Sequence, residues 1–92
     1  MRFEWDPKKN ATNRRKHGIA FEDVIAVFGV PYLERPEEDP HEGESRWIAV
    51  GEVEGRVLVV VYTWRGNARR IISGRKATKT EREQFYGTIY SG

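Results

Sequence analysis

The sequence predicts an α+β fold, in which an antiparallel meander of strands packs against helices. Most strand-like segments lie together, between residues 46 and 76. Short turn signals, Glu54-Gly55 and Arg65-Gly66-Asn67, join these segments and favour antiparallel pairing. Helix start and stop signals flank the region on both sides. A chain of 92 residues is expected to form a single domain over residues 1–92, with about four to five strands, two N-terminal helices and one C-terminal helix.

The first elements are a short strand and a helix. Residues 3–5 alternate apolar and polar side chains, which suits a strand. Asp6 and Pro7 then mark a helix start, because aspartate accepts from free backbone N–H groups and proline fits the first helical position. Gly18 tolerates the left-handed conformation that ends many helices, so a helix is expected over residues 7–17.

This first helix is polar on all sides. Between Lys8 and His17 its only apolar residue is Ala11. Such a helix has little apolar surface to bury, so it needs another anchor. Two possibilities remain open: long Lys and Arg stems lie over neighbouring residues, or the polar face binds a ligand or partner.

The second helix has an ordinary core stripe, with four apolar residues at i, i+3, i+4 and i+7: Phe21, Val24, Ile25 and Phe28. Gly29 and Pro31 stop it. Residues 32–34 suit a short strand, and residues 36–45 form an acidic loop that carries His41. This loop is expected to be solvated or to contact a protein partner.

Three strands and a helix follow. In residues 46–53 one face carries Trp47, Ala49 and Val53, and the other carries Ile48 and Val50. Residues 57–62 form a continuous apolar run, typical of a central strand buried on both sides. Residues 69–76 alternate, which predicts Arg69, Ile71, Ser73 and Arg75 on one face, opposite Arg70, Ile72, Gly74 and Lys76. Thr78 and Glu81 form a capping box that opens the last helix.

Composition narrows the function classes. The chain has no cysteine, which excludes disulfides and thiolate metal sites. Its longest apolar run, residues 57–61, is too short to cross a bilayer, and no signal-peptide-like stretch opens it, so a cytoplasmic location is expected. Its only histidines, His17 and His41, show no metal-ligand spacing, so no metal or cofactor is expected.

Charge is unevenly distributed, although the net charge is only +2. Basic residues are concentrated in segments 2–16 and 65–82, and acidic residues are concentrated in segment 34–44. If the two basic segments meet in space, they form a patch able to hold phosphates. The alternative is that these charges are scattered over a solvated surface.

Several segments together resemble the BrnT ribonuclease toxins of bacterial toxin–antitoxin systems. The residues that carry the likeness are Phe3-Glu4-Trp5-Asp6, Asn13, Lys16-His17-Gly18, Phe21, Gly43-Glu44 with Arg46, Val59-Val60-Val61-Tyr62-Thr63, Ile71-Ile72-Ser73-Gly74-Arg75-Lys76-Ala77-Thr78, Glu81-Arg82-Glu83 and Tyr86. They cover nearly the whole chain in order. Gly74 departs from the pattern, since the family more often has alanine there, and the glycine is expected to loosen the strand slightly.

The resemblance implies a RelE-like fold, a small twisted antiparallel sheet with helices against it. It implies metal-independent RNA cleavage that halts growth, without a cofactor. It also implies a BrnA-like antitoxin with a ribbon-helix-helix DNA-binding domain. Operator DNA would then be bound only through the toxin–antitoxin complex, which would repress its own promoter.

Metal-independent cleavage uses the 2′-hydroxyl of RNA as an internal nucleophile, so the protein must move protons and stabilise a charged phosphorane. His17 is the acid/base candidate, because histidine titrates near neutral pH and the end of a helix favours its protonated form. Arg75 is the candidate for phosphorane stabilisation, and Arg65 could also reach the substrate. The alternatives are a structural His17, an Arg75 paired to Glu81, and an Arg65 that is an ordinary hairpin charge.

Further residues could bind the RNA backbone. Lys9, Asn13 and Lys16 share one side of the first helix, and Lys76 follows Arg75. The lysines could instead be solvated, and Asn13 could tie the helix to a strand. The tryptophans Trp5, Trp47 and Trp64 are expected in the core, although Trp64, beside Arg65, could stack on a base.

Three functions therefore remain for the chain. The first is an endoribonuclease toxin that uses His17, Arg65 and Arg75. The second is a catalytically weak protein that mainly binds its antitoxin and tunes promoter repression. The third is an RNA-binding module that does not cleave.

Overall fold

The computed structural model describes residues 1–38 and 44–91. Residues 39–43 of the predicted acidic loop, which include His41 and Gly43, lie outside the described residues. One five-stranded sheet has the order β1-β5-β4-β3-β2. Its strands are β1 (Arg2–Glu4), β2 (Tyr32–Pro36), β3 (Trp47–Val53), β4 (Arg56–Arg65) and β5 (Ala68–Lys76). The helices are α1 (Pro7–His17), α2 (Phe21–Val24), the 3-10 helix η1 (Ile25–Gly29) and α3 (Lys79–Ile89).

The sheet confirms the α+β class but is mixed. Strands β2, β3, β4 and β5 form the predicted antiparallel meander. Strand β1 pairs with β5 in parallel, so the expectation of a wholly antiparallel sheet is wrong at this edge. Short hairpins enforce antiparallel pairing only between consecutive strands. No such turn joins β1 to β5, which are separated by most of the chain.

Helix α1 has the predicted bounds. The Asp6 side chain accepts a hydrogen bond from the backbone N–H of Lys8 at 2.8 Å. Gly18 ends the helix with a φ of 71°, and its N–H donates to the Arg14 carbonyl. That left-handed conformation is one that glycine adopts without steric cost.

Two asparagines hold α1 to the rest of the protein. The sequence left a tie through Asn13 open as an alternative, but gave no indication of the anchor through Asn10. Asn10 accepts from the backbone N–H of Phe21 at 2.8 Å and donates to the Glu22 carboxylate at 2.6 Å. That second bond lowers the pKa of Glu22. Asn13 bonds the backbone of Ile19 and Gly74. Since Asn10 and Asn13 are the two buried residues of α1, the helix docks through amides rather than apolar packing.

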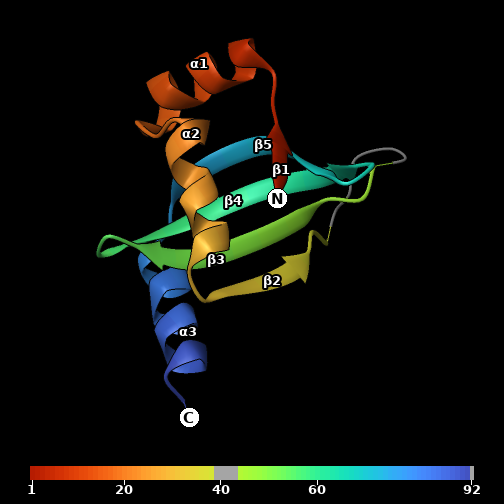
Figure 1. The fold of residues 1–92 in the computed structure, drawn as a ribbon. Helices are drawn as coiled ribbons and strands as arrows, with labels where there is room; N and C mark the ends of the chain where they lie inside the picture. The colour runs from red at the N-terminus through yellow and green to blue at the C-terminus, as the bar shows by residue number, and fades with distance from the viewer. Residues whose placement is uncertain (39–43, 92) are drawn as a thin grey trace.

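The main core lies between the sheet and α2 with η1 (Figure 1). Phe21, Val24 and Phe28 of the predicted stripe are buried. Ile25 is only partly buried, whereas Val27 is fully buried. The reason is that the helix tightens to a 3-10 helix at Ile25, which changes the periodicity of the inward face.

Helix α3 covers part of the opposite face of the sheet. Its predicted capping box is present, with Thr78 accepting from the Glu81 N–H and Glu81 accepting from the Thr78 N–H. Phe85 packs there against Val57 and Val59 of β4. The two apolar clusters confirm that β4 is the central strand buried on both sides. No helix in the described residues is both long enough and apolar enough to span a membrane.

A β-bulge in β5 changes which side chains share a face. The pairing with β4 shifts between Val61 and Tyr62, where Ser73 and Ile71 are their partners and Ile72 has none. The bulge places Ser73 and Arg75 on the α3 face together with Arg70, while Arg69 and Ile71 face the main core. The predicted face of Arg69, Ile71, Ser73 and Arg75 is therefore wrong, because strict alternation does not survive an inserted residue.

Gly74 is required by packing and does not merely loosen its strand. A Cβ atom built there would lie 2.8 Å from a methyl carbon of Val24. The backbone of β5 therefore approaches α2 more closely than any other residue type would allow.

Candidate nucleic-acid interface

Five arginines lie on the α3 face of the sheet, mostly beyond the helix itself. Val59 and Val50 pack in the apolar cluster that contains Phe85 of α3, so their side chains point to this face. The strand register then shows which alternate residues of each strand point to the same face. The arginines are Arg2 on β1, Arg35 on β2, Arg65 on β4, and Arg70 and Arg75 on β5. We call this surface the arginine face.

The arginine face retains an excess of positive charge. Glu4 lies on it, with its carboxylate 3.4 Å from Arg70 and 3.9 Å from Arg65. Arg65 is nevertheless open to solvent, with 63% of its side chain exposed. Arg2 donates to the Asn67 side chain, a neutral partner. Guanidinium groups on an open sheet suit a polyanion, because each can donate two hydrogen bonds to one phosphate.

Arg75 is held at the point where the sheet meets α3. Its guanidinium makes two hydrogen bonds to the Glu81 carboxylate, at 2.7 and 2.9 Å. The pair lowers the pKa of Glu81 to about 2 and raises that of Arg75. Glu81 also caps α3, so the capping box fixes the position of Arg75. The ion pair between Arg75 and Glu81, which the sequence left open as an alternative, is therefore present.

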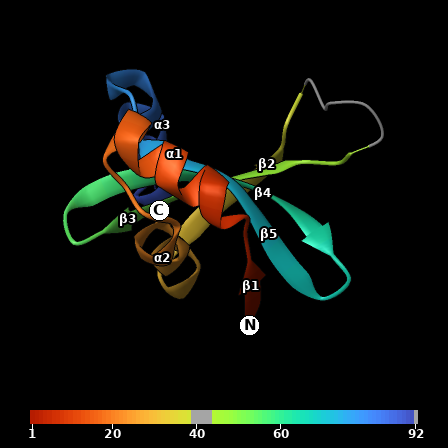
Figure 2. The ribbon, with the colours of Figure 1, turned by 90° about the horizontal axis from the view of Figure 1, so that it is seen from above.

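Helix α1 borders the arginine face along the open edge of β5 (Figure 2). Beyond its pairing with β1, β5 has no neighbouring strand on this side, and Asn13 bonds the Gly74 backbone there instead. Lys9, Lys16 and His17 line a shallow hollow between α1 and Ser73. The two basic segments of the sequence therefore meet in space at this edge.

The predicted site residues do not form one compact site. Arg75 pairs with Val59, six residues before Arg65 on β4, so their backbones lie about 20 Å apart. His17 is nearer to Arg75, because it shares a hollow with Ser73, which is about 7 Å from Arg75 along the strand. The two arginines cannot bind the same phosphate, although one extended RNA strand could contact both.

Asn13 and Lys76, which were also expected to bind RNA, lie in different surroundings. Asn13 is buried, and both hydrogens of its amide are used by the Ile19 and Gly74 carbonyls. Its observed role is the tie between helix and strand. Lys76 is exposed but lies on the face opposite Arg75, as the alternation of the sequence predicted.

Sequence interpretation missed Arg35 as a member of this surface, and it did not single out Arg2 and Arg70, although both lie in the two basic segments. Arg70 was assigned to the other face because the bulge at Ile72 leaves no clear mark in the sequence. Arg2 and Arg35 are distant in sequence, and only the strand order brings β1 and β2 onto one sheet. The run of arginines in residues 65–75 was the available signal.

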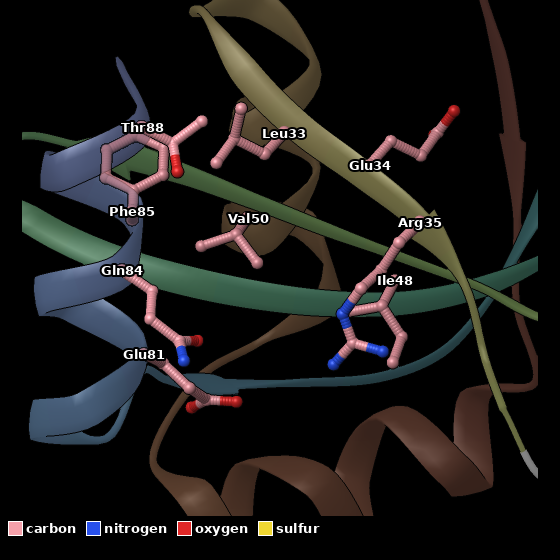
Figure 3. Close-up of a pocket in the computed structure, with 9 residues that line it drawn as sticks. All are labelled: Leu33, Glu34, Arg35, Ile48, Val50, Glu81, Gln84, Phe85 and Thr88. Carbon is pink, nitrogen blue, oxygen red and sulfur yellow. The ribbon is translucent and has the colours of Figure 1, made fainter. Parts of the chain in front are cut away.

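A groove continues the arginine face between α3 and strands β2 and β3 (Figure 3). Leu33, Val50 and Phe85 form its apolar part. Arg35 points to the same side of the sheet as Ile48, whereas Glu34 points away, where it accepts a hydrogen bond from Tyr62. Arg35 thus extends the arginine face to the opposite edge of the sheet.

Comparison with known families identifies the chain. No curated protein sequence matches it. The family model described as "Ribonuclease toxin, BrnT, of type II toxin-antitoxin system" matches residues 5–81. This span is most of the chain and includes Arg65, Arg70, Arg75 and Glu81. The chain therefore belongs to the BrnT family of ribonuclease toxins of type II toxin–antitoxin systems.

Proposed function

We propose that this toxin is a metal-independent endoribonuclease that binds single-stranded RNA along the arginine face and cleaves it near Arg75. The observation that carries the proposal is the arginine face bordered by His17, Lys9 and Lys16. Cationic side chains can stabilise a phosphorane without a metal ion.

The 2′-hydroxyl gives up its proton to solvent water as its oxygen bonds to the adjacent phosphorus. The bond from phosphorus to the 5′ oxygen then breaks and that oxygen takes up a proton, which gives a cyclic phosphate and a 5′-hydroxyl. In the proposal His17 supplies that proton and Arg75 stabilises the phosphorane. Arg65 and Arg70 bind flanking phosphates, since Arg65 is too distant to share the reacting one. Lys9 and Lys16 hold the backbone at the α1 border, and Lys76 contacts a more distant part of the substrate.

The proposed partner is a BrnA-like antitoxin with a ribbon-helix-helix domain, which neutralises the toxin and carries the complex to operator DNA. Membership of a type II toxin–antitoxin family supports an antitoxin partner. The proposed site of action is the cytoplasm, where the RNA substrate is found, and the proposed architecture is a single RelE-like domain.

One observation favours a second candidate, a catalytically weak toxin that mainly binds its antitoxin and tunes repression. Glu81 already occupies the edge of the Arg75 guanidinium that Nη1 and Nη2 form, one of the edges through which a phosphate could bind. In this alternative the ion pair persists, and the chain retains partner binding without rapid cleavage.

The experiment is induced expression of the unpartnered protein in bacteria, with primer extension on total RNA. We expect growth arrest and new RNA ends, both lost in Arg75→Ala and reduced in His17→Gln. Arg56→Ala is the matched control, because Arg56 is exposed but lies away from the arginine face. Cleavage that survives both site variants would refute the site, and a folded wild type without arrest or new ends would favour the second candidate.

A further inference from the structure

Trp64 is an exposed aromatic residue within the sheet. It is 46% exposed and lies next to Arg65 at the end of β4. The other large apolar side chains that are exposed in the described residues, Met1 and Tyr90, lie at the ends of the chain. An exposed indole beside an exposed guanidinium is a surface on which an unpaired nucleobase can stack.

The indole of Trp64 is held rigidly from behind. The buried guanidinium of Arg69 lies 4.5 Å from its ring centroid and 4.4 Å from that of Phe28. Tyr62 meets the Trp64 ring edge-on, with centroids 5.8 Å apart. A planar cation therefore covers one face of the indole, and its exposure leaves the other face open.

Polar groups surround the open ring. Trp64 and Arg65 line one hollow together with Glu44, Ser45, Trp47 and Thr63. The carboxylate of Glu44 is paired with Arg46 at 3.3 Å. The Thr63 hydroxyl donates to the Ser45 carbonyl at 2.7 Å, which ties the start of β3 to this end of β4. The hollow thus combines a flat aromatic surface, hydrogen-bonding groups and an exposed guanidinium.

We propose that Trp64 is a stacking platform for one unpaired nucleobase of the RNA. It lies next to Arg65 at the end of β4, on the side of the sheet opposite the arginine face and about 17 Å from Arg75 along the strands. The inference rests on the proposed RNA-binding function. Arg65 binds the phosphate of the same nucleotide, and the base turns over the end of the sheet onto the indole. Stacking recognises the flat face that every base has, so this subsite selects unpaired RNA rather than a sequence.

A nucleobase fits this surface better than an aliphatic side chain of a protein partner. Arg65 ends β4 on the arginine face and Trp64 precedes it on the other side of the sheet, so an RNA strand that follows the guanidinium groups reaches the indole by turning around the end of β4. Stacking on a rigid indole also costs little conformational entropy, because Arg69 and Tyr62 already fix the ring.

The test uses a 2′-O-methyl RNA of about eight nucleotides, a typical length for such a site, which lacks the attacking hydroxyl and cannot be cleaved. Its matched probe has the same backbone but no bases. Fluorescence anisotropy at low salt measures the affinity of each probe for the wild type, Trp64→Leu and Trp64→Phe. Tyr90→Leu is the control for loss of an exposed aromatic residue elsewhere, and circular dichroism confirms that each variant is folded.

We expect Trp64→Leu to weaken binding of the base-bearing probe by roughly 5- to 150-fold, the range of one stacked base, and to leave the abasic probe unchanged. Trp64→Phe should lose much less affinity, because a flat ring remains. Equal losses on both probes, or no loss on either, would overturn the platform while leaving RNA binding intact. Loss of antitoxin binding alone would assign the ring to the protein partner and overturn the proposal. A wild type that binds neither probe would refute the proposed function itself.

Discussion

The side chain of Asn13 bonds both backbone groups of Gly74, much as a neighbouring strand would. Its Oδ1 accepts from the Gly74 N–H at 3.2 Å, and its Nδ2 donates to the Gly74 carbonyl at 2.8 Å. This part of β5 has no strand beside it, and buried backbone groups need partners. One amide therefore completes the sheet edge and positions α1 beside the arginine face.

We predict that Asn13→Ala destabilises the protein by about 2–4 kcal/mol, because it leaves several buried backbone groups without partners. Asn13→Asp should be at least as harmful, since a carboxylate cannot donate to the Ile19 and Gly74 carbonyls. Urea unfolding measures both. Thr12→Ala is the matched control on the same helix, and its exposed position should keep the change within about 0.5 kcal/mol. Equal stability of Asn13→Ala and wild type would contradict this role.

We predict that Gly74→Ala destabilises the protein by about 1–3 kcal/mol, the usual cost of an overpacked contact. The added methyl would meet Val24, which is fully buried. In a Val24→Ala background the same change should cost at least about 1 kcal/mol less, because space has been opened. Thermal unfolding of the four proteins gives this coupling directly. Additive effects would mean that the two residues do not compete for space.

Much of the fold was predictable from local signals. Asp6, Pro7 and Gly18 set the bounds of α1, and Thr78 with Glu81 set the start of α3. These devices act within a few residues, so the sequence shows them directly. The α+β class and the central strand followed from periodicity for the same reason.

The rest depended on contacts between distant segments. Asn13 anchors α1 through Gly74, and nothing local in the sequence separates such an asparagine from a solvated one. The bulge at Ile72 puts Arg70 on the same face as Arg75, because one unpaired residue reverses the alternation between the residues before it and those after it. The catalytic roles of His17 and Arg75 stay predictions, whereas the pairing of Arg75 with Glu81 was foreseen as an alternative and is observed.

Acid should weaken the protein through Glu81. Arg75 lowers the pKa of this carboxyl from 4.5 to about 2. Because the pKa in the folded state is lower, the pair stabilises the fold fully above pH 4.5 and loses its contribution as pH falls toward 2. We expect the free energy of unfolding to fall more steeply over this window in the wild type than in Arg75→Gln. Parallel pH profiles for the two proteins would show that the ion pair adds no stability.

The last prediction tests the arginine face itself. Arg70 lies on that face, and Arg56 is an exposed arginine of β4 on the opposite face, near the other end of the sheet. Arg70→Gln should weaken binding of a non-cleavable RNA and reduce the slope of log affinity against log salt by about 0.7, the value for one lost phosphate contact on a single strand.

Arg56→Gln removes the same charge and should leave both quantities unchanged if the phosphates contact only the arginine face. Affinity measured from low to moderate salt separates the two variants. Equal slopes for Arg56→Gln and Arg70→Gln would show that RNA responds to the net charge of the whole protein. A difference confined to Arg70→Gln would place the RNA on the α3 face, because the two substitutions change net charge identically and differ only in where they lie on the sheet.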